Sequence, residues 1–94
     1  MDRLELFNKV ALAVKADSVT GYTPISDLNI TWDKTGLDSL DAIMVNVYLA
    51  EVFGIDEEVS KQFMFTTPNE LLDLVEQNKT KTPASIEEIL EIIQ

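Results

Sequence analysis

The chain has 94 residues, of which 46% are hydrophobic, enough apolar material for one compact domain with a modest core. It has no cysteine and no histidine, which excludes disulfides, cysteine-based metal sites and the commonest general base. Its 17 acidic and 7 basic residues give a formal net charge of −10. This charge disfavours binding to nucleic acid and favours protein partners with basic patches. The acidity can also serve solubility alone.

No apolar run is long enough to span a membrane, and the opening "MDRLELFNKV" lacks the pattern of a signal peptide. We therefore expect a cytoplasmic protein that does not insert into membranes. Enzyme activity of its own is not expected, because a serine nucleophile would have no histidine base, and a lysine base would need a dry pocket that a domain of this size rarely builds.

The first predicted element is an amphipathic helix from Asp2 to about Lys15. Apolar residues recur along it at spacings of three and four, namely Leu4, Phe7, Val10, Ala11 and Val14. Turn-forming residues predict its end, namely Asp17, Ser18, Thr20, Gly21 and Pro24.

A long connection to Asp38 follows. Apolar residues recur through it, namely Ile25, Leu28, Ile30, Trp32 and Leu37. Disordered linkers lack such anchors, so we expect an ordered loop held across the helices, with Trp32 as an anchor and no sheet.

The second predicted helix begins after Asp38, whose carboxylate is a good N-cap, and Asp41 adds a favourable negative charge in the first turn. Its apolar residues cover more than one face, namely Leu40, Ile43, Val45, Val47, Leu49, Val52 and Phe53. Such a helix is either deeply buried or partly presented to something else. Gly54 is a suitable terminator.

Two shorter helices are predicted next. The first runs from Asp56 to about Phe63, with Val59 and Phe63 one turn apart. The second begins with a hydroxyl N-cap, a proline at the first helical position and a glutamate that completes a capping box, namely Thr67, Pro68 and Glu70, and the polar stretch 77–82 ends it.

The C-terminal stretch "PASIEEILEIIQ" repeats the capping-box pattern with Ser85 and Glu88. Its apolar residues form one face, namely Ile86, Ile89, Leu90 and Ile93. We expect this helix to pack on its own domain rather than to dock a partner, and we expect a monomer.

The sequence therefore predicts an all-α protein. Residues 1–78 form a small four-helix bundle with a long ordered loop between the first and second helices. Residues 79–94 form a linker and a short amphipathic helix, packed on or appended to the same domain.

Ser39 occupies the first position of the second predicted helix, directly after the N-cap Asp38. Unpaired backbone N–H groups and the helix dipole at such an end favour a phosphate ester on this hydroxyl. A serine is also simply well tolerated beside a cap, and the tripeptide Asp-Ser-Leu by itself does not separate the two interpretations.

The stretch "GLDSLDAIMVNVYLAEVFGI", in a small acidic chain with this order of helices, resembles the acyl carrier protein family over about Asp2 to Asn78. The resemblance implies that Ser39 carries 4′-phosphopantetheine, attached from coenzyme A by a separate phosphopantetheinyl transferase. The arm would supply the thiol that this chain lacks and would carry acyl groups as thioesters to partner enzymes. Fatty acyl, polyketide and aminoacyl or peptidyl cargo all remain open, and so does a non-acylated interaction module.

The resemblance further implies that Asp38, Leu40 and Asp41 frame the attachment point. The second helix would be the main recognition surface, and an acyl chain would find space between the second and third helices. Acyl-transferring or acyl-modifying enzymes would dock there through basic or apolar patches.

This chain departs from the family pattern in several places. Met44 and Ala50 stand where glutamates are usual, while Glu51 remains, and Lys34 and Thr35 replace a usual acidic residue and a usual leucine. The hypothesis is that partners recognise Ile43, Met44 and Val47 through apolar contact more than through charge.

Two further residues of this helix are open to a structural interpretation. Asn46 is expected to face solvent, although contact with the arm or cargo is the alternative, and Tyr48 is expected to be a core aromatic with its hydroxyl at the edge. The acidic run of Asp56, Glu57 and Glu58 is a solvated helix start rather than a metal site.

Overall fold

The protein is described by a computed structural model that covers residues 2–16 and 21–93. Within these ranges it contains the α-helices α1 (Arg3–Val14), α2 (Ser39–Val52), α3 (Glu57–Ser60), α4 (Pro68–Asn78) and α5 (Ile86–Ile93), and the 3-10 helix η1 (Trp32–Lys34). The described residues contain no strand, so the all-α prediction is confirmed.

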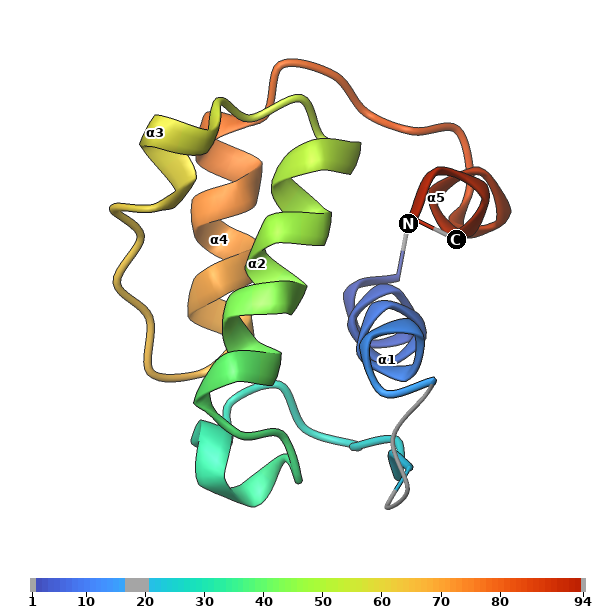
Figure 1. Cartoon of the computed structure of the whole chain (residues 1–94), viewed down its shortest axis with the longest axis vertical. Helices are drawn as coiled ribbons and strands as arrows, with labels where there is room; N and C mark the ends of the chain where they lie inside the picture. Colours follow the sequence, from blue (N-terminus) through green and yellow to red (C-terminus); the bar gives the residue numbers. More distant parts are fainter. Residues whose placement is uncertain (1, 17–20, 94) are drawn as a thin grey trace.

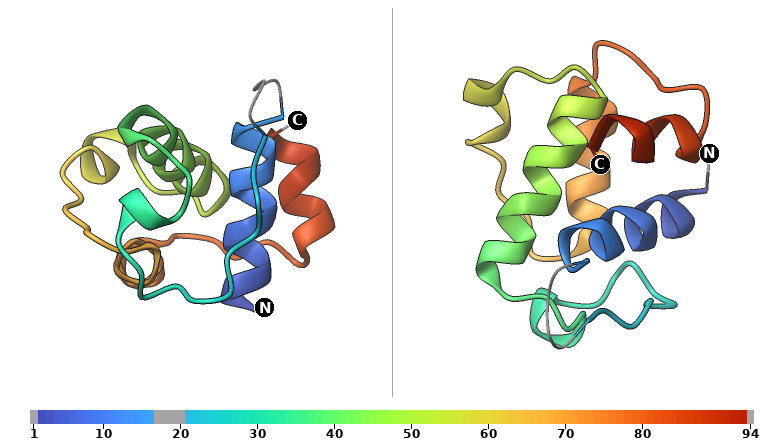
Figure 2. Two further views of the ribbon diagram at one scale, coloured as in Figure 1. Left: turned by 90° about the horizontal axis from the view of Figure 1, so that it is seen from below. Right: turned by 45° about the vertical axis from the view of Figure 1, so that its right-hand side comes forward.

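The helices form two neighbouring groups around a common core. Figure 1 shows α2 beside α4, with the short α3 at their outer end and α1 and α5 on the other side of α2. Figure 2 shows α5 lying against α1 in two further views, and α5 also contacts α2. Because α2 contacts α1, α3, α4 and α5, it is the central element of the fold.

The core is built mainly from the inward faces of these helices. Its fully buried large side chains include Phe7 and Val10 of α1, Val45 and Leu49 of α2, Leu71 of α4 and Ile89 of α5. The predicted apolar stripe of the first helix is therefore mostly confirmed. Leu6, which lies outside that stripe, is also buried.

The described part of the α1–α2 connection is held against α1. The helix α1 begins after Asp2, which accepts a hydrogen bond from the Leu4 N–H. The residues Asp17, Ser18 and Thr20, predicted to end it, lie outside the described residues. Further along, Asn8 donates to the Ile25 carbonyl at 2.9 Å and accepts from the Ile25 N–H at 3.0 Å.

Trp32 anchors the described part of this loop, as predicted. Its ring lies between the rings of Phe7 and Phe65, with centroid distances of 5.7 and 5.5 Å. Leu37 is buried at the end of the loop. The 3-10 turn that contains Trp32 was not predicted, because a three-residue element has no detectable periodicity.

The prediction for the short third helix is partly wrong. It starts after the cap Asp56 as expected, but α3 ends at Ser60 rather than near Phe63. Ser60 is its buried residue, whereas Val59 is exposed. One turn is too short for apolar spacing to define an inward face, so the pairing of Val59 with Phe63 was misleading.

In the capping boxes of α4 and α5, the glutamate accepts its hydrogen bond one residue earlier in the chain than predicted. Glu70 accepts from the N–H of Thr66 at 2.9 Å, and Glu88 accepts from the N–H of Ala84 at 2.8 Å. Each glutamate therefore reaches past the capping residue to the residue before it. The hydroxyls of Thr67 and Ser85 accept from the N3 amides as predicted.

The segment after α4 is tied to the end of α2. The backbone N–H of Thr80 donates to the Phe53 carbonyl at 3.0 Å, and the Thr80 hydroxyl donates to the Gly54 carbonyl at 2.6 Å. These bonds satisfy carbonyl groups left over at the C-terminal end of α2. Beyond this segment, α5 inserts Ile89 into the core.

Among the helices of residues 2–16 and 21–93, none is long and apolar enough to cross a membrane.

Candidate functional site

Ser39 is the first residue of α2 and is exposed. Asp38 is the N-cap, and the predicted reciprocal bonds with Asp41 are present: the Asp41 N–H donates to Asp38 Oδ1 at 2.8 Å and the Asp38 N–H donates to Asp41 Oδ2 at 3.2 Å. The Ser39 hydroxyl makes no hydrogen bond to another described residue. It therefore lies exposed at a helix start that the capping box closes.

The turn before Ser39 is held by Thr35. Its buried hydroxyl donates to the Trp32 carbonyl at 2.6 Å and accepts from the Leu37 N–H at 3.1 Å. Gly36 follows with a φ of 84°, a left-handed conformation that glycine adopts without strain. The hydrogen bonds of Thr35 thus hold the turn that leads into α2. Thr35 stands at a position where the resemblance implies a leucine.

Lys15, at the end of α1, pairs with Asp41 across the site, with Nζ and Oδ2 2.9 Å apart. Burial of the Asp41 carboxyl by itself raises its pKa. The hydrogen bonds from Lys15 and the Asp38 N–H, together with the positive charge of Lys15, outweigh burial and lower this pKa below its ordinary value of 3.8. Asp41 is therefore held as an anion inside the fold rather than being wholly available to a partner.

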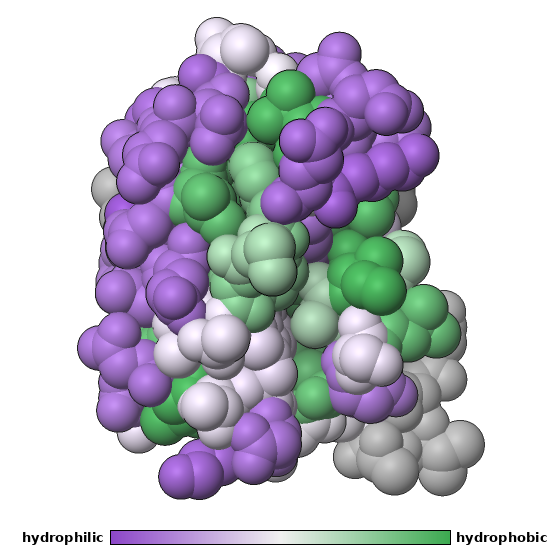
Figure 3. All heavy atoms as spheres, turned by 90° about the vertical axis from the view of Figure 1, so that its left-hand side faces the viewer, coloured by the Kyte–Doolittle hydropathy of each residue, from purple (hydrophilic) through white to green (hydrophobic). Residues whose placement is uncertain are grey.

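Apolar side chains surround the exposed part of α2. Leu40 is 65% and Ile43 57% exposed, and Val47 is exposed one turn further on, whereas Met44 is half-buried. Val59 of α3 and Met64 of the α3–α4 loop are also exposed. Figure 3, which shows the side of the molecule carrying α3 and this loop, displays hydrophobic residues gathered between hydrophilic ones. We call Leu40, Ile43, Val47, Val59 and Met64 the apolar face.

Charged side chains border the apolar face. Glu51 is exposed on α2, and Glu57 and Glu58 begin α3, where both lie near Lys61 at 3.5 and 3.7 Å. Among the described residues, no three histidine, cysteine, aspartate or glutamate side chains converge as metal ligands. The acidic start of α3 is thus part of a charged surface.

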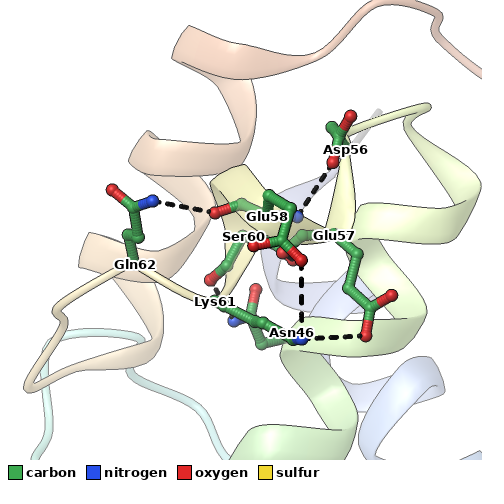
Figure 4. Close-up of polar contacts among 7 residues, drawn as sticks. All are labelled: Asn46, Asp56, Glu57, Glu58, Ser60, Lys61 and Gln62. Carbon is green, nitrogen blue, oxygen red and sulfur yellow. Dashed lines mark hydrogen bonds and ion pairs between the residues drawn. The ribbon is translucent and has the colours of Figure 1, made fainter.

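Asn46 connects α2 to α3, so the expectation that it faces solvent is wrong. Its side-chain nitrogen donates to the Ser60 carbonyl at 3.0 Å, as Figure 4 shows. Its side-chain oxygen is buried and has no hydrogen-bond partner within the described residues. Tyr48, by contrast, packs against the core while remaining partly exposed, as expected.

A groove of about 280 Å³ lies between α2 and α3, where the resemblance implies space for cargo. Val47, Ala50 and Ile55 supply apolar walls, and Glu51, Glu57 and Ser60 supply polar ones. The Ser60 hydroxyl donates to the Glu57 carbonyl at 3.1 Å.

Sequence reasoning did not find Lys15, Ser60 and Met64 as parts of the site. Lys15 stands where a cation is favoured, at a helix C-terminus, but nothing in the chain identifies Asp41 as its partner. Ser60 gave no signal, because a serine in a one-turn helix is usually exposed. Met64 lies between two phenylalanines, and nothing in this apolar run signals that its side chain is exposed.

The chain matches the sequence profile of the family described as "Phosphopantetheine attachment site" over residues 11–75. No curated protein and no solved structure matched the chain. Since the matched region covers more than half of the chain and includes α2, its cap and most of α4, this protein belongs to the phosphopantetheine-binding carrier family.

Membership means that the protein carries 4′-phosphopantetheine as a covalent prosthetic group and works as a carrier with a phosphopantetheinyl transferase and partner enzymes. Carrier domains of this family are not themselves catalytic. The residues present fit the group: an exposed, uncommitted hydroxyl stands at a helix N-terminus, and the arm brings the thiol that the chain lacks.

Proposed function

We propose that Ser39 is the attachment residue and that the protein carries acyl groups as thioesters on the arm. The observation that carries this proposal is the position of the Ser39 hydroxyl, exposed at the first residue of α2 beside an intact Asp38–Asp41 capping box. A transferase can reach this oxygen without unfolding the helix, and the first-turn N–H groups favour the attached phosphate.

The loading reaction is a phosphoryl transfer. The Ser39 oxygen attacks the phosphorus of coenzyme A that bears the pantetheine, a new P–O bond forms, and the pyrophosphate bond breaks to release adenosine 3′,5′-bisphosphate. The hydroxyl proton leaves to a base of the transferase, since this chain has no histidine and the nearby carboxylates, Asp38 and Asp41, are engaged in the cap.

Partners are proposed to dock on the apolar face. Its exposed side chains surround Ser39 on α2 and continue onto α3, and the usual glutamates of the resemblance are replaced by Met44 and Ala50. Apolar side chains that a partner buries contribute more to binding than exposed ion pairs do. Glu51 and the overall negative charge then attract basic patches on the partner and speed the encounter.

Cargo is proposed to be sheltered in the α2–α3 groove. Fatty acyl, polyketide and aminoacyl or peptidyl groups are all compatible with a thioester on this arm. A non-acylated interaction module, the other interpretation of the sequence, does not account for the family match.

The test is an intact-mass measurement after incubation with coenzyme A and a broad-specificity transferase. The wild type and Ser26→Ala, which changes another exposed serine, should each gain one phosphopantetheine, and Ser39→Ala should gain none. Circular dichroism should show that all three are folded. A phosphopantetheine on folded Ser39→Ala would refute the assignment of Ser39.

A further inference from the structure

Met64, in the loop between α3 and α4, is the most exposed large apolar residue of the described chain, at 89%. Its two neighbours lie on the other side of the loop: Phe63 and Phe65 are half-buried and pack against the core. Alternate residues of an extended chain point in opposite directions, so two inward phenylalanines direct the methionine outward. The exposure of Met64 therefore follows from how its neighbours pack.

The chain on each side of Met64 is held to the fold. Before it, the Phe63 N–H donates to the Ser60 carbonyl at 3.1 Å. After it, the Phe65 ring lies against the Trp32 ring, with 5.5 Å between the centroids. None of these contacts uses the Met64 side chain, so a chemical change at its sulfur would leave them in place.

Met64 is also the most accessible sulfur group of the described residues. The chain has no cysteine, and the other described methionine, Met44 of α2, is half-buried. Met64 lines a surface hollow of about 410 Å³ that a small oxidant can enter. Because an oxidant must reach the sulfur to react with it, a peroxide should oxidise Met64 before Met44.

We propose that Met64 is an oxidation site and that its sulfoxide weakens partner docking. This inference rests on the proposed docking of partners on the apolar face. The oxidant is a peroxide: the thioether sulfur attacks one peroxide oxygen, an S–O bond forms and the O–O bond breaks. The displaced hydroxide takes the proton of the transferred oxygen, so the sulfur is oxidised by two electrons to the sulfoxide and hydrogen peroxide is reduced to water.

The sulfoxide brings a polar oxygen onto the apolar face. The other side chains of that face are hydrocarbons that donate no hydrogen bond, namely Leu40, Ile43, Val47 and Val59. A partner that covers the sulfoxide removes its oxygen from water, and the carrier supplies no donor to compensate. The core loses no contact, so oxidation should weaken docking without unfolding the carrier. Methionine sulfoxide can be reduced again, so the change is reversible.

The experiment treats the full chain, before loading, with dilute hydrogen peroxide at neutral pH and locates sulfoxides by peptide mass spectrometry. Met64 should be oxidised several-fold faster than Met44. The KM of the phosphopantetheinyl transferase for the oxidised carrier should rise several-fold, while the melting temperature changes little. Methionine sulfoxide reductases of both stereospecificities should restore the original KM.

Two variants separate Met64 from the other methionines. Met64→Leu keeps an apolar side chain of similar size but cannot form a sulfoxide, so peroxide treatment should leave its KM where it was before treatment. Met44→Leu keeps Met64 and should show the same several-fold rise as the wild type. Circular dichroism should show that both variants are folded.

Several outcomes would overturn the inference. These are oxidation of Met44 as fast as Met64, an unchanged KM for a carrier mapped as the Met64 sulfoxide, and a rise in KM that persists in treated Met64→Leu. A large fall in melting temperature on oxidation would show that the sulfoxide acts through the fold instead.

Ile43→Ser, measured beside these samples, reports on the apolar face as a whole. A raised KM for Ile43→Ser with an unchanged KM for the Met64 sulfoxide would refute this inference alone. No effect of either change would refute the docking proposal on which it rests. Intact mass of the untreated wild type tests loading itself, and failure to gain phosphopantetheine would refute the carrier proposal.

Discussion

Lys15 Nζ lies 2.9 Å from Asp41 Oδ2, and the two side chains are only 13% and 15% exposed. Lys15 is the C-cap of α1, and Asp41 is the third residue of α2, two positions after Ser39. One ion pair therefore joins the end of the first helix to the turn that presents Ser39. Because the pair is largely shielded from water, removing one partner leaves a poorly hydrated charge and costs more than breaking an exposed pair does.

This ion pair predicts a dependence of stability on pH. The pKa of Asp41 is lowered in the folded protein, so ionisation of this group stabilises the fold above its unfolded pKa, and the contribution is lost as the pH falls through the folded value. Lys15→Met should lower the free energy of unfolding by about 1–3 kcal/mol at neutral pH. The difference from the wild type should shrink as the pH falls below about 4.

Urea unfolding at a series of pH values measures this difference. Other carboxyls with lowered pKa values, such as that of Glu70, are present in both proteins, so their contributions cancel. Lys9→Met, on an exposed part of α1, is the control and should have little effect. A Lys15→Met deficit that stays constant down to pH 3 would rule out the role assigned to Asp41.

The apolar face predicts how the transferase recognises the carrier. Ile43→Ser should raise the KM for the carrier about tenfold, because a buried apolar contact of about 1.4 kcal/mol is lost. Leu12→Ser is the matched control, since Leu12 is 48% exposed on α1, outside the apolar face. Met44→Ala should also weaken binding more than Glu51→Gln does. If neutralising Glu51 abolished binding while Ile43→Ser and Met44→Ala had no effect, charge would dominate recognition.

The buried position of Ile89 predicts that α5 stabilises the whole carrier. Ile89→Ala should lower the free energy of unfolding by about 2–5 kcal/mol, whereas Ile92→Ala, at an exposed position on the same helix, should cost no more than about 0.5 kcal/mol. Chemical denaturation measures both. We further propose that residues 79–94 belong to the same domain, so truncation after Asn78 should lower the melting temperature. Unchanged melting of the truncated chain would contradict that proposal.

Gly54 predicts a steric effect at the end of α2. It has a φ of 67°, and an added Cβ would collide with the Thr80 hydroxyl oxygen. Gly36, with a φ of 84°, has nothing within 4 Å of such a Cβ. Gly36→Ala should therefore cost about 1–2 kcal/mol for the left-handed backbone alone, and Gly54→Ala should cost more. Equal losses in thermal or urea unfolding would show that the Thr80 contact yields without strain.

Local signals were sufficient to predict much of the fold and the position of Ser39. These signals involve residues within one or two helical turns of each other, so they can be recognised in the sequence. They are the Asp38 cap, the Thr67-Pro68 start of α4 and the apolar spacing of α1. Trp32 was identified as a loop anchor because it is one of several apolar residues that recur through the loop, a pattern that disordered linkers lack.

Contacts between residues distant in the chain could not be predicted in this way. The hydrogen bond from Asn46 to Ser60 and the ion pair between Lys15 and Asp41 depend on how two helices pack against each other. The spacing of residues along one helix does not predict that packing. The hydrogen bonds that Glu70 and Glu88 accept from the residue before the N-cap could not be predicted for a similar reason. The same sequence pattern allows the glutamate to accept either from the N-cap N–H or from the N–H before it. The path by which the chain enters the helix decides between the two.

The attachment of α2 at both of its ends has a consequence for how the molecule opens. Lys15 holds its first turn, and Thr80 bonds to its last carbonyls, whereas the one-turn α3 is joined to α2 by the side-chain bond of Asn46 to Ser60. Local opening should therefore start at residues 57–66 and leave α2 intact. In a native-state hydrogen exchange experiment, this segment would form the least protected cooperative unit, so that cargo could enter and leave while the helix bearing Ser39 keeps its shape.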